Sequence, residues 1–232
     1  IDRIEIGARV KQAIKHCNLE GTEREYPGSL SAGQQQRIAL ARAIVTNPQV
    51  MLLDEPLSNL DPSLRESMRF EIKRLQEEFN FTIVFVTHDQ SEAMAISDRM
   101  MVMDMGSVVQ IDTPINLYNR PKTRFVHNFL GESNFTNVIL ENGRAYVEGD
   151  MDQCLPVDFP RKSAREMVLA TRPHQIEMKR SDGYKCIIDK CTFLTNCLEY
   201  LVRVGNQYLK VQTSHQNEFS KGETCYLRFP AA

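Results

Sequence analysis

Two acidic side chains, Asp54 and Glu55, directly follow a short apolar segment. Residues 50–53 do not alternate between apolar and polar types, which predicts a strand of a parallel sheet that is covered on both faces. Open α/β sheets bind ligands at the C-terminal ends of such strands. Asp54 is suited to hold Mg²⁺, and Glu55 to polarise a water for attack on a phosphoryl group. Alternatively, the pair only caps the strand, although adjacent carboxylates repel unless a cation or a proton intervenes.

A second candidate site lies at the start of the helix that precedes this strand. Ser31 and Gln34 have the spacing of a capping box, in which both side chains satisfy backbone amides of the first turn. Gly33 adds no side chain, so the amides at the positive end of the helix dipole would be open to a bulky anion. An ordinary capped helix is the alternative. The helix is expected to run to about residue 46, because Pro48 denies the next amide.

Two further motifs follow the acidic pair. Asp61 precedes Pro62, which predicts a helix that starts with an Asp cap, runs to residue 79 and turns its apolar face to the core. Residues 81–86 predict a second apolar strand. His88 comes just after this strand, where it could touch a γ-phosphate, although a lone histidine is more often structural.

In their order and spacing, these segments resemble the ATPase subunit of ABC transporters. Residues 30–37 (LSAGQQQR) resemble the signature motif, and residues 50–56 resemble the Walker B strand with its acidic end. SNLD at 58–61 is similar to the D-loop, and VTHD at 86–89 to the H-loop. The resemblance implies an α/β fold, the C-terminal part of a P-loop NTPase (ABC ATPase) domain.

The resemblance also implies a role for each motif residue. Three signature residues would contact ATP that is held by the opposite subunit of a head-to-tail dimer, namely Ser31, Gly33 and Gln34. Asp54 would hold the Mg²⁺ shell, and Glu55 would be the general base. Asp61 would cross the dimer interface, and His88 would sense the γ-phosphate. Ala32 departs from the family pattern, because the usual signature has glycine there, and its methyl group adds bulk at the phosphate-facing turn.

A larger departure is the phosphate loop, a strand followed by GxxxxGK[ST], which does not occur in these 232 residues. The nearest match, residues 28–33, continues with Gln34 and Gln35 where Lys and Ser/Thr are required. The first strands of the family, its base-stacking aromatic residue and its glutamine loop are also missing. We therefore expect a fragment that begins in the middle of the fold and that has no measurable ATPase activity alone.

Beyond residue 131 the sequence changes to short apolar segments separated by turn signals. Asn142-Gly143 and Gly205-Asn206 are two-residue hairpin signals, and together the segments predict a small all-β, OB-like barrel. Residues 125–136, the Thr171-Arg172-Pro173 element and the closing hairpins resemble the regulatory TOBE domain of importer ATPases.

The predicted domains are 1–130, the partial ATPase domain, and 131–232, the TOBE-like domain. A bare OB-like fold could instead bind oligonucleotide or oligosaccharide. The sequence shows no basic and aromatic stripe that would support nucleic acid, and its net charge of −2 predicts no strong attraction to nucleic acid or anionic lipid.

Composition predicts a chain that reaches membranes only through partners. No apolar run approaches the length of a membrane span, and the start does not have the pattern of a signal peptide. Six cysteines are present, and the cluster of Cys186, Cys191 and Cys197 fits no common zinc spacing. In a reducing compartment they are expected to be buried structural thiols.

The leading hypothesis is therefore a fragment of an ABC importer subunit that hydrolyses MgATP and is peripheral to the cytoplasmic face of the inner membrane. The implied partners are membrane permease subunits, a second ATPase subunit and, indirectly, an extracytoplasmic solute-binding protein. The resemblance points to the group of importers for polyamines, iron, phosphonate and sugars, and within that group loosely to polyamines. The alternative is a non-catalytic regulatory or ligand-binding module. An ABC ATPase of DNA repair is disfavoured, because such proteins have long coiled-coil insertions.

Overall fold

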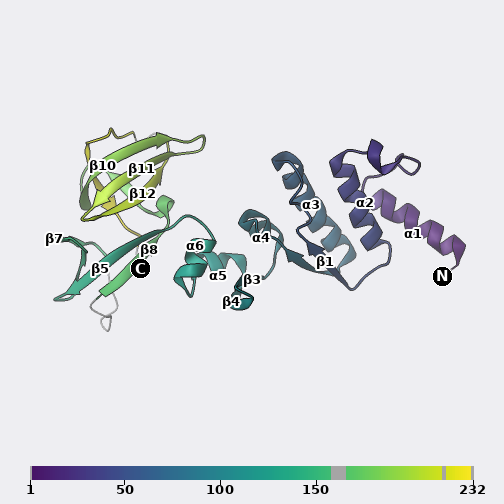
Figure 1. Ribbon diagram of the computed structural model, residues 1–232, viewed down its shortest axis with the longest axis horizontal. Helices are drawn as coiled ribbons and strands as arrows, with labels where there is room; N and C mark the ends of the chain where they lie inside the picture. Colours follow the sequence, from purple (N-terminus) through teal and green to yellow (C-terminus); the bar gives the residue numbers. More distant parts are fainter. Residues whose placement is uncertain (1, 158–165, 216–217, 231–232) are drawn as a thin grey trace. The chain divides into compact units, whose positions relative to one another are not determined.

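The computed structural model describes residues 2–157, 166–215 and 218–230. The chain divides into two compact units, Ile1–Asn119 and Arg120–Ala232 (Figure 1). Helices and a parallel strand pair dominate the first unit, and antiparallel strands dominate the second. This order confirms the predicted α/β part followed by an all-β part. In the described ranges, no helix is both long enough and apolar enough to cross a membrane.

The first unit places helices around a parallel pair of strands. Its helices are α1 (Arg3–His16), η1 (Pro27–Ser29), α2 (Ala32–Ile44), α3 (Pro62–Phe79), α4 (Gln90–Ile96) and α5 (Pro114–Asn119). Its strands are β1 (Val50–Asp54), β2 (Thr82–Val86), β3 (Met100–Asp104) and β4 (Ser107–Asp112). β1 and β2 pair in parallel with Asp54 opposite Val86, so their C-terminal ends meet at one edge. α3 buries Met68, Ile72 and Leu75 in the core that it shares with β1.

Among the described residues, the β1–β2 sheet is covered on one face only. Met51 packs into the core and is 4% exposed, whereas its neighbour Leu52 is 75% exposed. The uncovered side chains alternate along both strands, namely Val50, Leu52, Val84 and Val86. The prediction that residues 50–53 are covered on both faces is therefore wrong for this structure, because the helices of the core pack against only one side of the pair.

This uncovered apolar face should make the chain self-associate. Water-exposed aliphatic side chains gain free energy when two such faces meet. We expect sedimentation velocity to show species above the monomer, and the double variant Leu52→Gln, Val84→Gln to return the chain to monomer. Phe70→Gln is the matched control, because Phe70 is 71% exposed but lies on α3. A wild-type chain that sediments as a sharp monomer would contradict this expectation.

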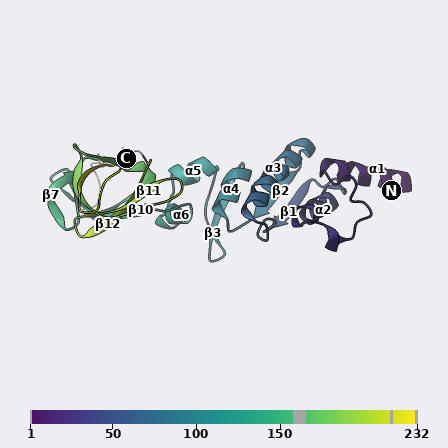
Figure 2. The same cartoon turned by 90° about the horizontal axis from the view of Figure 1, so that it is seen from above.

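The second unit has two antiparallel sheets around one core. Its elements are α6 (Arg124–Phe129), β5 (Asn134–Glu141), β6 (Arg144–Val147), β7 (Asp150–Leu155), β8 (Glu166–Thr171), η2 (Pro173–Gln175), β9 (Glu177–Lys179), β10 (Tyr184–Phe193), β11 (Leu198–Val204), β12 (Gln207–Thr213) and β13 (Thr224–Arg228). The strand orders are β7-β6-β5-β8 and β12-β11-β10-β13-β9. Both predicted hairpins, β5–β6 and β11–β12, are confirmed. Figure 2 shows β7, β10, β11 and β12 around the interior.

Side-chain amides join the two sheets, and Asn134 is one example. Asn134 of β5 donates from Nδ2 to the Lys210 carbonyl of β12 at 2.8 Å and accepts the Lys210 amide at Oδ1, also at 2.8 Å. The Asn134 side chain therefore pairs with the backbone of Lys210 as a neighbouring strand would. Val138 and Tyr200, from opposite sheets, belong to the same buried cluster. The predicted barrel is thus built from two sheets that side-chain amides bridge, with Gln207 and Gln153 making comparable contacts to the backbone of Asn137 and Lys185.

A buried arginine attaches α6 to the second unit. Arg172 is 2% exposed, and its Nη1 donates to the carbonyls of His127 and Gly131, both at 2.7 Å. These carbonyls lie at the C-terminal end of α6, where a cation is favoured. Burial and the Arg172 charge lower the pKa of His127. α6 therefore belongs to the second unit, which begins at Arg120. The sequence predicts a later domain boundary, between residues 130 and 131. The ATPase and TOBE-like assignments stay predictions.

The cysteines do not follow their grouping in the sequence. Cys186 of β10 lies opposite Cys225 of β13, with 3.2 Å between the two sulfurs, and both free thiols are buried. The hydrogen bond with the Cys225 thiol, together with burial, raises the pKa of Cys186. The expectation of a buried structural thiol is confirmed for Cys186 and wrong for Cys191, which is exposed, while Cys197 is half-buried.

Candidate functional site

The N-terminus of α2 carries the signature-like residues in the predicted cap. Ser31 Oγ accepts the Gln34 amide at 3.3 Å, and Gln34 Oε1 accepts the Ser31 amide at 2.9 Å. The capping box is therefore confirmed. Each of these side chains binds the helix end itself. A nucleotide contact by Ser31 or Gln34 would have to share or replace these hydrogen bonds.

Gly33 has a packing role that the sequence did not indicate. It is buried, and a Cβ atom placed on it would lie 2.8 Å from Leu64 Cδ1 of α3. The missing side chain thus lets the first turn of α2 approach α3. Gln36, one turn further along, donates to the Pro56 carbonyl at 2.6 Å. These two contacts tie α2 to the segments that follow β1, while an anion contact by Gly33 stays a prediction.

Glu55 directly follows β1 and has a left-handed backbone conformation, with φ of 44°. Such a conformation costs a non-glycine residue on the order of 1–3 kcal/mol. Hydrogen bonds hold it in place, because the Glu55 amide donates to the Val86 carbonyl at 2.8 Å and its carbonyl accepts the Ser58 hydroxyl at 3.0 Å. The turn therefore fixes the acidic pair at the shared edge of β1 and β2.

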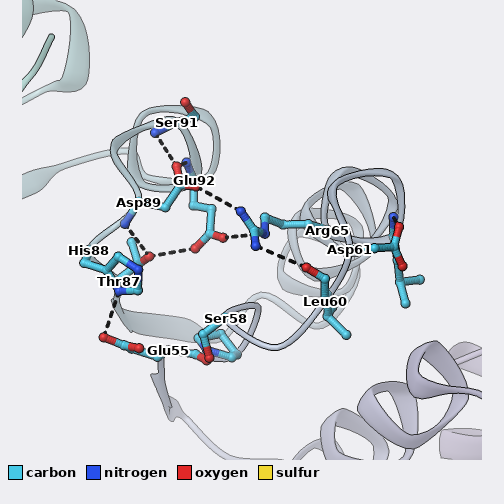
Figure 3. A network of polar contacts seen from close by, with 12 residues as sticks. Glu55, Ser58, Leu60, Asp61, Arg65, Thr87, His88, Asp89, Ser91 and Glu92 are labelled. Carbon is cyan, nitrogen blue, oxygen red and sulfur yellow. Dashed lines mark hydrogen bonds and ion pairs between the residues drawn. The ribbon is translucent and has the colours of Figure 1, made fainter.

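At this edge the structure brings Glu55 and His88 together. His88 Nδ1 lies 3.0 Å from Glu55 Oε1, and the side chains are 75% and 48% exposed, respectively (Figure 3). The hydrogen bond to the Glu55 carboxylate, reinforced by its charge, raises the pKa of His88. A carboxylate and an imidazole that face solvent beside each other form an arrangement suited to proton transfer and phosphate contact.

This pairing predicts a shifted titration of His88. In Glu55→Gln the carboxylate charge is gone, so the His88 pKa should fall towards its ordinary value in an NMR titration. The sign follows from linkage: the pair stabilises the fold below the ordinary histidine pKa and loses its contribution as pH rises through the raised value. His215 serves as a control within the same spectrum. An unchanged His88 pKa in the variant would show that the two residues do not interact in solution.

Asp54 fits a role in holding Mg²⁺. Its carboxylate is exposed, and no hydrogen bond or ion pair that the structure describes occupies it. Within the described ranges no three His, Cys, Asp or Glu side chains form a metal-binding group. Mg²⁺ usually takes only one or two protein carboxylates and completes its shell with water and phosphate oxygens, so a single carboxylate at this edge suits it.

Asp61 serves its own helix in this structure. It caps α3, and its Oδ1 accepts the Leu64 amide at 3.0 Å. The structure thus joins Glu55 to His88 directly, whereas Ser31, Gln34 and Asp61 each bind the end of a helix.

Sequence reasoning missed the residues that hold the His88 loop. Glu92 of α4 is 2% exposed and accepts the Thr87 hydroxyl at 2.7 Å, and Arg65 of α3 faces it (Figure 3). A signal was present, because Asp89 and Glu92 have the spacing of a cap followed by an acidic third residue.

Comparison with known protein families finds a match in the N-terminal part of the chain. The sequence profile of the ABC transporter family matches residues 2–58, which include the signature-like segment and both acidic residues. In sequence, the chain is similar to ATP-binding proteins of ABC transporters.

Particular relatives are similar over nearly the whole chain. A protein of Escherichia coli O157:H7, "Fe(3+) ions import ATP-binding protein FbpC", is 52% identical over 92% of this chain and 61% of its own length. The protein of that name from Vibrio cholerae is 41% identical over 90% of this chain and 60% of its own. "Spermidine/putrescine import ATP-binding protein PotA" of Pseudomonas fluorescens is 38% identical over 99% of this chain and 65% of its own length. The chain therefore spans less than two thirds of these relatives.

Proposed function

We propose that this chain is part of the ATP-hydrolysing subunit of an ABC importer. The observation that carries the proposal is the Glu55–His88 pair at the common end of β1 and β2, with Asp54 beside it. The names of the relatives support ATP binding and import.

In the proposed reaction Glu55 takes a proton from the attacking water. One carboxylate oxygen binds His88 at 3.0 Å, which leaves the other oxygen for the water. The partial positive charge on the His88 imidazole would face the γ-phosphate and stabilise its negative charge. Asp54 would hold Mg²⁺, and that ion would neutralise charge on the phosphate oxygens.

We propose that the second ATP-contacting surface comes from another copy of the subunit in a head-to-tail dimer. Ser31, Gly33 and Gln34 at the start of α2 would face the triphosphate of that copy, and Asp61 would cross the interface. Support comes from the helix N-terminus itself, whose dipole favours phosphate.

We also propose partners and a solute class. Membrane permease subunits would bind the ATPase at the cytoplasmic face of the inner membrane, and a solute-binding protein would act indirectly. The solutes in the relatives' names, Fe(3+), spermidine and putrescine, are all cationic. A small cation is therefore the proposed cargo, with polyamines among the candidates. Residues 131–232 would be the TOBE-like regulatory domain.

The test is MgATP binding and hydrolysis by this chain and by a version extended upstream in its own reading frame. We expect binding and turnover only in the extended version, because these 232 residues contain no GxxxxGK[ST] loop to hold the β- and γ-phosphates. Turnover by the chain alone would refute the expected inactivity. Failure of both versions would instead favour the non-catalytic regulatory module that the missing motif suggests.

A further inference from the structure

One guanidinium connects the loop before α3 to the loop that carries His88. Arg65 lies in the first turns of α3, and its Nη2 donates to the Leu60 carbonyl at 3.1 Å. Its Nη1 donates to Asp89 Oδ2 at 3.3 Å, and its Nε lies 3.5 Å from Glu92 Oε1 (Figure 3). Three acceptors from two loops and a neighbouring helix therefore surround one side chain.

The other ends of these contacts fix the backbone on both sides of His88. Glu92 Oε2 accepts the Thr87 hydroxyl at 2.7 Å, and Thr87 Oγ1 accepts the Asp89 amide at 3.0 Å. Asp89 Oδ1 accepts the Ser91 amide at 2.8 Å. His88 itself lies between these anchored residues, and its imidazole contacts Glu55.

Burial makes this network depend on Arg65. The Glu92 side chain is 3% exposed, and a carboxylate removed from water is costly unless a cation compensates it. Arg65 supplies that cation while it holds the carbonyl of Leu60, the residue directly before Asp61. A planar guanidinium can serve several acceptors in fixed directions, which a lysine ammonium cannot.

We propose that Arg65 is a positioning residue that locks the His88 loop and the Asp61 loop into one geometry. This inference rests on the proposed function for its purpose: a γ-phosphate contact at His88 would then be transmitted to the residue proposed to cross the dimer interface. A shift of either loop would have to break contacts of the same side chain.

The decisive experiment uses this chain without nucleotide. Arg65→Lys keeps the charge beside Glu92, so the fold should persist, but it loses the simultaneous contacts to both loops. We expect amide hydrogen exchange to accelerate about tenfold at both loops, at Leu64, whose amide binds Asp61, and at Asp89 and Ser91. Arg69→Lys is the matched control, because it lies on the same helix outside this network.

The two loops separate a positioning role from a merely local one. If exchange accelerates only at Asp89 and Ser91, Arg65 supports α4 alone and the inference is overturned. Unchanged exchange at both loops overturns it as well. In the extended protein we expect Arg65→Lys to lower kcat about tenfold with little change in KM for MgATP. A wild-type extended protein without turnover would defeat the proposed function, while the exchange result would still decide the role of Arg65.

Discussion

Replacing Glu55 by glutamine should lower ATP turnover of the extended protein by about 10²–10⁴-fold while MgATP binding persists. The amide has nearly the shape of the carboxylate, but it cannot take a proton from water. Its carbonyl oxygen can still accept a hydrogen bond from His88 Nδ1, which lies 3.0 Å from the native carboxylate. A loss of this size would therefore point to proton transfer rather than to the position of His88.

Phosphate release at saturating MgATP measures this effect, and calorimetric titration of nucleotide measures binding separately. Glu66→Gln makes the same chemical change at an exposed position of α3 and should leave both quantities unaltered. Normal turnover in Glu55→Gln would remove Glu55 from the role of general base and with it the main support for the proposed reaction.

The second large effect concerns stability: Arg172→Met should lower the free energy of unfolding of the second unit by about 3 kcal/mol. Arg172 is buried, and its Nη1 serves the carbonyls of His127 and Gly131 at the end of α6. Methionine fills similar space but removes the Nη1 hydrogen bonds. The Ser133 hydroxyl, 3.2 and 3.0 Å from the two carbonyls, can donate to only one of them, and a buried acceptor without a partner costs about 1–3 kcal/mol. Entry of water should relieve part of the cost.

Urea unfolding followed by far-UV circular dichroism measures this change. Arg203→Met is the control, because Arg203 is exposed on β11 and its replacement should change stability by no more than about 0.5 kcal/mol. Equal midpoints for the two variants would mean that the Arg172 contacts contribute nothing net. Separate analysis of the two units is needed if the transition is not two-state.

Local features of the site followed from the sequence. The caps at Ser31 and Asp61 both form as expected, because each joins a side chain to an amide three residues away. The helix of residues 62–79 ended at the expected residue, where Asn80 adopts a left-handed conformation. The placement of Asp54 and Glu55 at the end of a strand was also correct.

Several features required the three-dimensional structure. The exposed face of Leu52 could not be deduced, because an apolar run reads the same whether helices cover one side of the strand or both. The contact of Gly33 with Leu64 and the pairing of Cys186 with Cys225 join residues that are far apart in the chain.

The sequence alone thus determined which residue types stand at the strand ends and helix starts, since spacing of up to four residues fixes capping and periodicity. Only the tertiary structure decided that Glu55 meets His88, because that contact depends on the parallel register of β1 and β2. The same holds for Arg65, whose three acceptors converge only after α3 and α4 have packed together. Contacts between distant segments depend on packing geometry, which local residue preferences do not encode.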